Sequence, residues 1–97
     1  MKQHTYKITL THELDQHDHP VSPEQTLTFQ AKNHDDILSV VARMKQSGHF
    51  DDEQTATQFA VGLKLFSEVM LENRNHPLFQ DFSEHFGVFM KQLKRGK

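Results

Sequence analysis

The sequence contains no cysteine, and this absence excludes several classes of protein at once. Without cysteine the chain can form no disulfide framework, offers no thiolate nucleophile and cannot build a cysteine-based zinc site. No stretch approaches the roughly 20 consecutive apolar residues that a transmembrane helix needs, and residues 1–6 show no apolar run of the signal-peptide type. We therefore expect a cytoplasmic protein with no membrane partner.

The sequence also lacks the glycine and serine patterns that are typical of catalytic loops. The four glycines stand alone, at positions 48, 62, 87 and 96, so there is no glycine-rich phosphate loop. None of the five serines lies in a nucleophile-elbow context. The formal net charge is only −2, so we do not expect nucleic acid as a partner. Together these absences favour a non-enzymatic interaction module with an unknown protein partner.

The first third of the chain has the pattern of two β-strands. Residues 5–14 alternate between apolar and polar side chains, and residues 26–31 do so again. This period of two is typical of half-buried strands. The segment Asp15–Glu24 between them contains two prolines and no apolar pattern, which predicts a loop. The two strands should pair as an antiparallel hairpin with one apolar face and one solvated face.

After the second strand the apolar spacing lengthens, which predicts helices. We place the first helix between a cap at Asn33 and the Ser47–Gly48 pair, because asparagine favours helix starts and glycine favours helix ends. The second helix begins at Asp51, which has capping-box spacing to Gln54, and runs to about Asn73. Its apolar stripe is broad, so we expect this helix to be the most buried.

A third helix is predicted to begin at Pro77, since proline suits the first turn of a helix. It carries a seam of apolar side chains that we expect in the core: Phe79, Phe82, Phe86, Phe89 and Leu93. Gly62 and Gly87 lie inside the second and third helices, where glycine costs about 1 kcal/mol relative to alanine. We interpret them as points of close approach between helices.

These elements predict one α+β domain over residues 1–97, an N-terminal antiparallel β-hairpin packed on three α-helices in the order ββααα. A two-stranded hairpin is marginal in water unless its apolar face is covered, and we expect the helices to cover it. The hairpin still has two unpaired edges. Pairing across a two-fold axis would join two copies into a four-stranded sheet, so we predict self-association as a homodimer.

Five segments spread along the chain carry a resemblance to a known family. They are Tyr6–Thr9, His34–Ile37, Gly62–Leu71, His76–Phe79 and Phe89–Lys91. In combination they resemble the domain of unknown function 3861 family, a group of small uncharacterised bacterial proteins. The resemblance implies a small α+β bacterial protein with no agreed activity, and it supplies no catalytic residues.

The densest group of potential metal ligands lies in the loop between the strands. His17 and His19 point the same way in an extended segment, and with His12 and Asp15 they offer ligands for a divalent metal. Against this, a flexible loop loses conformational entropy when it closes on a metal. The competing interpretation is a solvated loop whose histidines titrate. A metal- or small-ligand-binding protein using this loop is therefore the first alternative function.

A second alternative is an enzyme with acid–base residues at the junction of hairpin and helices. The segment His34–Asp36 holds a histidine and two carboxylates, and paired carboxylates serve acid–base chemistry when burial separates their pKa values. A helix N-terminus favours the ionised form of both, so helix capping is the competing interpretation. Further along, Glu68, Glu72 and His76 share one helix face, and we expect them to be solvated.

Overall fold

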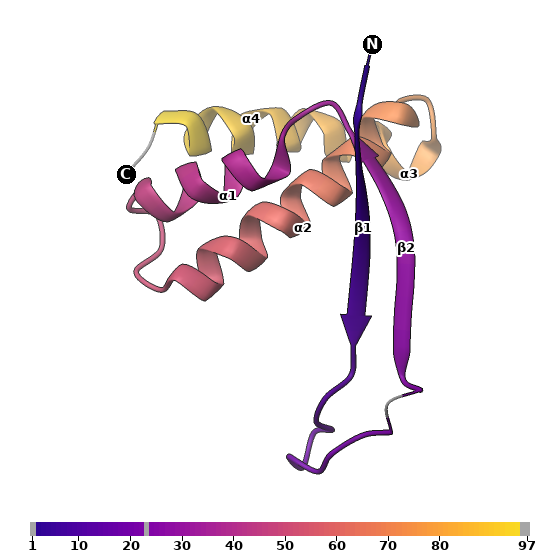
Figure 1. Ribbon diagram of the computed structural model, residues 1–97. Helices are drawn as coiled ribbons and strands as arrows, with labels where there is room; N and C mark the ends of the chain where they lie inside the picture. Colours follow the sequence, from indigo (N-terminus) through magenta and orange to yellow (C-terminus); the bar gives the residue numbers. More distant parts are fainter. Residues whose placement is uncertain (1, 23, 96–97) are drawn as a thin grey trace.

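The computed structural model describes residues 2–22 and 24–95. Its elements are β1 (His4–Thr11), β2 (Thr26–Asn33), α1 (Ile37–Gln46), α2 (Glu53–Glu72), α3 (Pro77–Gln80) and α4 (Phe82–Arg95). The predicted α+β class, with a hairpin followed by helices, is confirmed. Figure 1 shows the helices gathered in one body and the hairpin projecting from it. Among the described residues, no helix has both the length and the apolar character needed to cross a membrane.

Strands β1 and β2 pair antiparallel over eight residues each. The register places the apolar side chains on one face: Tyr6 opposite Ala31, Ile8 opposite Phe29 and Leu10 opposite Leu27. The other face is polar and consists mainly of threonines, as the alternation predicted. β1 stops at Thr11, and Leu14, which was expected to continue it, forms an isolated bridge with Pro20 instead.

The hairpin is attached to the helices at its base by polar contacts. The Tyr6 hydroxyl donates to the carbonyl oxygen of Asp35 at 3.1 Å and accepts the amide of Ile37 at 2.8 Å. Asn33, which is 0% exposed, donates its side-chain N–H to the carbonyl oxygen of Lys64 at 2.9 Å. Its side-chain oxygen accepts the amide of Asp35 at 2.9 Å. Asn33 therefore ends β2 and anchors it, and the prediction that it caps the first helix is wrong.

Two aspartates cap the long helices. Asp36 caps α1 and Asp52 caps α2, each accepting backbone amides of the first turn. Hydrogen bonds from Ser39 lower the pKa of Asp36, and hydrogen bonds from Thr55 lower the pKa of Asp52. The prediction of Asp51 as the second cap is wrong by one residue, because Thr55 lies three residues after Asp52 and bonds back to it.

The ends of α1 and α2 follow the sequence-based prediction. α1 ends at Gln46, with Ser47 as its C-cap, and Gly48 follows in the left-handed region with a φ of 84°. Glycine tolerates this conformation because it has no Cβ. α2 ends at Glu72, with Asn73 as its C-cap. Local residue chemistry was therefore sufficient to place both of these helix ends.

The core lies between α1 and α2. Its buried centre is Met44, Ala56 and Ala60, with Val40, Val41, Phe50, Phe59 and Leu93 packed against it. Three of the six buried apolar residues lie on α2, which confirms that the second helix is the most buried. A Cβ added at Gly62 or Gly87 would meet nothing within 4 Å among the described residues. The interpretation of these glycines as points of close helix approach is therefore wrong.

The predicted third helix is split into the short α3 and the longer α4. α3 begins at Pro77 as predicted. Over Phe82–Arg95, α4 has no buried residue, and Phe82 and Phe89 are 43% and 40% exposed. The ring of Phe66 on α2 lies 5.9 Å from Phe82 and 6.2 Å from Phe86, centroid to centroid. The phenylalanine seam thus rests on α2 through ring contacts. Its prediction as core is confirmed at Phe79, which is 8% exposed, and is wrong at Phe82 and Phe89.

The outer half of the hairpin is not covered by the helices. Leu10, Leu27 and Phe29 are 65%, 57% and 42% exposed, although all three lie on the apolar face. Figure 1 shows the strands running well past the helical body. The helices therefore meet the hairpin at its base only, and the expectation that they cover its whole apolar face is wrong.

Candidate functional site

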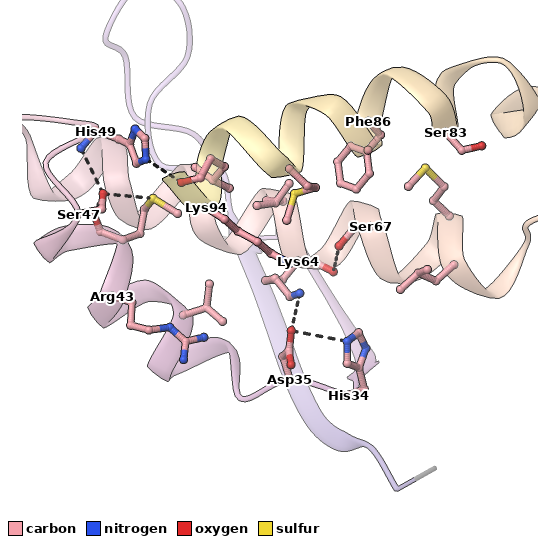
Figure 2. Close-up of a pocket in the computed structure, with 18 of the residues that line it drawn as sticks. His34, Asp35, Arg43, Ser47, His49, Lys64, Ser67, Ser83, Phe86 and Lys94 are labelled. Carbon is pink, nitrogen blue, oxygen red and sulfur yellow. Dashed lines mark hydrogen bonds and ion pairs between the residues drawn. The ribbon is translucent and has the colours of Figure 1, made fainter. Parts of the chain in front are cut away.

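A groove of about 770 Å³ lies between α4 on one side and α1 and α2 on the other. This volume falls in the range of small-molecule sites. Figure 2 shows its lining, which comes from all three helices and from the turn before α1. The α4 residues that face it are Ser83, Phe86, Gly87, Met90, Leu93 and Lys94. Their spacing of mainly three and four residues puts them on a single helix face.

The floor of the groove is apolar and adaptable. Its apolar lining residues are Val40, Met44, Leu63, Met70, Leu71, Phe86, Met90 and Leu93. Three of the four methionines of the chain are among them. Methionine has three rotatable bonds and a polarizable sulfur, so it adapts to apolar groups of different shape. Gly87 adds open space, because it has no side chain on the groove-facing side of α4.

The rim of the groove is cationic. Arg43, Lys64, Arg74 and Lys94 line it, and Asp35 is the one carboxylate residue among the described lining residues. Lys64 Nζ lies 2.6 Å from Asp35 Oδ2, so these two charges compensate each other. The other three cations have no ion-pair partner within residues 2–22 and 24–95. A chain of net charge −2 therefore places three positive charges with no ion pair in its described part around one apolar groove, and one of them, Arg43, also lowers the pKa of Asp35.

Asp35 is held in its ionised form. The hydrogen bond from Lys64 is the largest influence on this carboxylate, and it lowers the pKa of Asp35 despite partial burial. A general acid or base at neutral pH needs a pKa near the operating pH. The shift at Asp35 goes in the opposite direction. The acid–base interpretation of the junction is therefore not favoured by this carboxylate.

Beside the groove, Glu68 joins three separate parts of the chain. It is 6% exposed, and its two oxygens bond His34 Nδ1 and the Gln3 side-chain N–H, each at 2.7 Å. His34 Nε2 lies 3.6 Å from Asp35 Oδ2, so each ring nitrogen of this histidine faces a carboxylate. The expectation that Glu68 is solvated is wrong, because the hairpin base crosses α2 at this point. We interpret this cluster as a polar clasp between hairpin and helix.

The histidine-rich loop is organised by Asp15. Its Oδ1 accepts the backbone amides of His17 and His19 at 2.8 and 3.0 Å. The two imidazole rings lie 6.1 Å apart, and His12 is exposed just after β1. Across residues 2–22 and 24–95, no three histidine, aspartate or glutamate side chains are grouped to hold a metal ion. Metal binding by His12, Asp15, His17 and His19 stays a prediction.

No pattern in the sequence predicted the groove as a site. Its cations lie on α1, on α2, in the turn after α2 and on α4, and they come together only when α4 lies over α2, so no local motif contains them. One signal was available: Met90 and Leu93 follow Phe86 along one face of α4, which marks an apolar stripe. The stripe alone does not show that Arg43 and Arg74 would stand at the edges of the space it faces.

Comparison with known proteins agrees with the fold and leaves the activity open. Residues 4–95 match the model of a family described as a domain of unknown function with a solved structure, DUF3861. The structure is similar to a crystal structure of a protein of unknown function from Pectobacterium atrosepticum, with a TM-score of 0.81 and 33% sequence identity. That alignment covers 97% of this chain and 99% of the other. No curated protein matches the sequence.

Proposed function

The chain belongs to the domain of unknown function 3861 family, whose description names no activity, and we propose from the groove that it is a non-catalytic binding protein for amphipathic anions. Such a ligand has an apolar chain and an anionic head group. The observation that carries this proposal is an apolar groove of about 770 Å³ bordered by three cations, Arg43, Arg74 and Lys94, that form no ion pair with another described residue.

The apolar floor and the cationic rim would play different roles. Burial of apolar surface contributes about 25 cal/mol per Å², so an alkyl chain in the groove supplies most of the affinity. An exposed ion pair contributes only about 0.2–1 kcal/mol. The rim cations therefore supply selectivity for a negative head group. Asp35 does not oppose such a group strongly, because Lys64 compensates its charge.

The clasp beside the groove supports binding over catalysis. Each ring nitrogen of His34 faces a carboxylate, so neither nitrogen points freely into the groove to exchange a proton with a ligand. Asp35 is paired with Lys64, and the pKa of Asp35 is lowered. These groups hold the groove wall in place, which is the role expected of the frame of a binding site.

Calorimetric titration with dodecanoate and with uncharged dodecanol tests this proposal. We expect saturable, one-site binding of dodecanoate below its micelle concentration. Dodecanol should bind about fivefold more weakly, which corresponds to about 1 kcal/mol of rim selectivity. The double variant R43Q/K94Q should lose this preference while still binding dodecanol. Equal affinity for the two probes in the unmodified protein would contradict the role of the cations.

The two helix glycines provide a matched pair of variants for the groove itself. Gly87 lines the groove and Gly62 does not, and neither has a neighbour within 4 Å of an added Cβ among the described residues. Gly87→Leu places a branched side chain in the groove and should weaken dodecanoate binding at least tenfold. Gly62→Leu should leave it unchanged. Full binding by Gly87→Leu would show that dodecanoate binds elsewhere, and the proposal would be wrong.

The proposal includes a cellular location, the bacterial cytoplasm. Small exported domains commonly depend on disulfides for stability, and this chain has no cysteine with which to form one. Fractionation of cells that express the protein at its natural level is the direct test. Recovery with the periplasmic or membrane fraction would contradict the cytoplasmic location without affecting the groove.

A further inference from the structure

The outer half of the hairpin has an apolar face that no other part of the described chain covers. Leu10 lies opposite Leu27, and Phe29 lies next to them along β2 on the same face. All three side chains are exposed. The opposite face carries threonines such as Thr9 and Thr28, which lie across from each other. The outer half of the hairpin is thus exposed on both faces, including the face that the alternation of the sequence marks as apolar.

The whole chain exposes more surface than a compact monomer of its mass. Its accessible surface is 7853 Å², whereas a folded monomer of 11.3 kDa exposes about 5,700 Å². Its radius of gyration is 15.8 Å, whereas a compact chain of 97 residues has about 12.5 Å. The excess is roughly 2,100 Å². A stable protein interface needs about 800 Å² from each partner, so the excess suffices for one.

We infer that a second copy of this chain covers the apolar face of the hairpin. A two-stranded hairpin is marginal in water by itself, so the outer half of this hairpin needs a cover to be stably formed. Another copy of the chain is a partner that the protein itself supplies at sufficient concentration. A two-fold contact also uses the same face on both copies, so each molecule covers its partner with the surface that it needs covered. This inference does not depend on the proposed ligand of the groove.

The face of the hairpin fits this interface better than its edge does. Pairing of two β1 edges would make a four-stranded sheet, but Leu10, Leu27 and Phe29 would stay in water on both copies. Face-to-face contact places two sheets about 10 Å apart, and their side chains interdigitate. The lysines of the strands, Lys7 and Lys32, lie on the opposite face and do not oppose each other across this contact.

Sedimentation analysis of the full chain and of two sets of hairpin variants tests the inference. The unmodified protein should sediment with twice the mass of 11.3 kDa. The variant L27T/F29T keeps residues that favour strands but removes the apolar face, and it should raise the dimer Kd about 100-fold or more. The control Gln30→Thr changes the neighbouring residue on the polar face and should leave the Kd unchanged. A monomeric unmodified protein, or an L27T/F29T dimer as tight as the original, would overturn the inference.

Hydrogen exchange on the unmodified protein keeps the inference testable if L27T/F29T fails to fold. The amides of β1 and β2 should lose protection when the protein is diluted below its dimer Kd, while those in the centre of α2 keep theirs. This selective loss is expected because the partner covers the hairpin and not the core between α1 and α2. Hairpin protection that stays constant across the dimer-to-monomer transition would place the interface elsewhere and contradict the inference.

Discussion

The two ends of the hairpin reverse the usual distribution of polar and apolar groups. At the base, the polar side chain of Asn33 is completely buried and Tyr6 bonds two backbone groups near the start of α1. In the outer half, Leu10 and Leu27 are largely exposed. Polar contacts therefore fix the hairpin on its own chain, while the apolar surface of its outer half stays exposed in the described chain. In this fold, the contacts that attach the hairpin are therefore made by polar residues at its base and not by its apolar face.

The strongest test of this comparison is to remove the buried polar anchor. Asn33→Ala removes the buried hydrogen bond to the carbonyl of Lys64 and leaves the amide of Asp35 without its side-chain partner. An unsatisfied buried group costs about 1–3 kcal/mol and a lost hydrogen bond about 1 kcal/mol, so we expect the free energy of unfolding to fall by about 2–4 kcal/mol in urea denaturation. The exposed neighbour Lys32→Ala is the control and should change it by less than about 0.5 kcal/mol. Equal effects of the two substitutions would show that the buried contacts of Asn33 do not hold the base of the hairpin.

The outer half should respond in the opposite way. Leu10→Thr keeps a strand-forming residue and removes an exposed apolar side chain. We expect the dimer Kd to rise about tenfold, which is about 1.4 kcal/mol. Under conditions in which both proteins are monomeric, the free energy of unfolding should change by less than about 0.5 kcal/mol. Sedimentation at several concentrations and urea denaturation of the diluted protein separate the two effects. A large loss of monomer stability would show that Leu10 is already packed within one chain.

The helical body provides a neutral reference for both ends of the hairpin. Gly62→Ala adds a methyl group that meets nothing within 4 Å in the described part of the chain. Alanine favours helix over glycine by about 0.8–1 kcal/mol, so the thermal midpoint should rise by several degrees. The dimer Kd should not change, because α2 is outside the proposed interface. A lower thermal midpoint would indicate that this position on α2 contacts a partner.

The smallest expected effect is the pH dependence of the Asp35–Lys64 pair. Because the pKa of Asp35 is lowered on folding, its contribution to stability is complete above the unfolded pKa of about 3.9 and is lost as the pH falls through the lower folded value. Asp35 is 41% exposed, so Asp35→Asn should cost less than about 1 kcal/mol at pH 7. This difference from the unmodified protein should disappear in urea denaturation at pH values well below 4. A difference that grows on acidification would show that the carboxylate is stabilised in its protonated form.

Sequence patterns predicted the elements whose causes are local. Alternation identified both strands, Pro77 marked the start of α3, and Gly48 marked the end of α1, because each effect involves neighbouring residues. The contacts of Asn33 and Glu68 were missed, since their partners lie 31 and 34 or more positions away in the sequence. A polar residue in a strand or helix does not show by itself whether a distant element will bury it.

The same reason explains the error at α4 and the missed groove. Periodicity showed that Phe82, Phe86 and Phe89 share one side of a helix. It did not show how closely that side approaches α2, where Phe66 meets the seam through ring contacts alone. Phe86 also lines the groove, and the cations of the groove belong to elements with independent local patterns. The candidate site depends on how closely α4 approaches α1 and α2, and the local sequence patterns do not contain this distance.

Asp35 places the attachment point of the hairpin at the wall of the groove. The Asp35 side chain lines the groove, while its backbone carbonyl accepts the Tyr6 hydroxyl that fixes the hairpin base. Eight residues of strand extend about 26 Å. A rotation of the hairpin by about 10° around this attachment point would displace the far end of the strands by roughly 4–5 Å. Any rotation of the hairpin about its base would therefore move the tip of the strands much further than the groove wall.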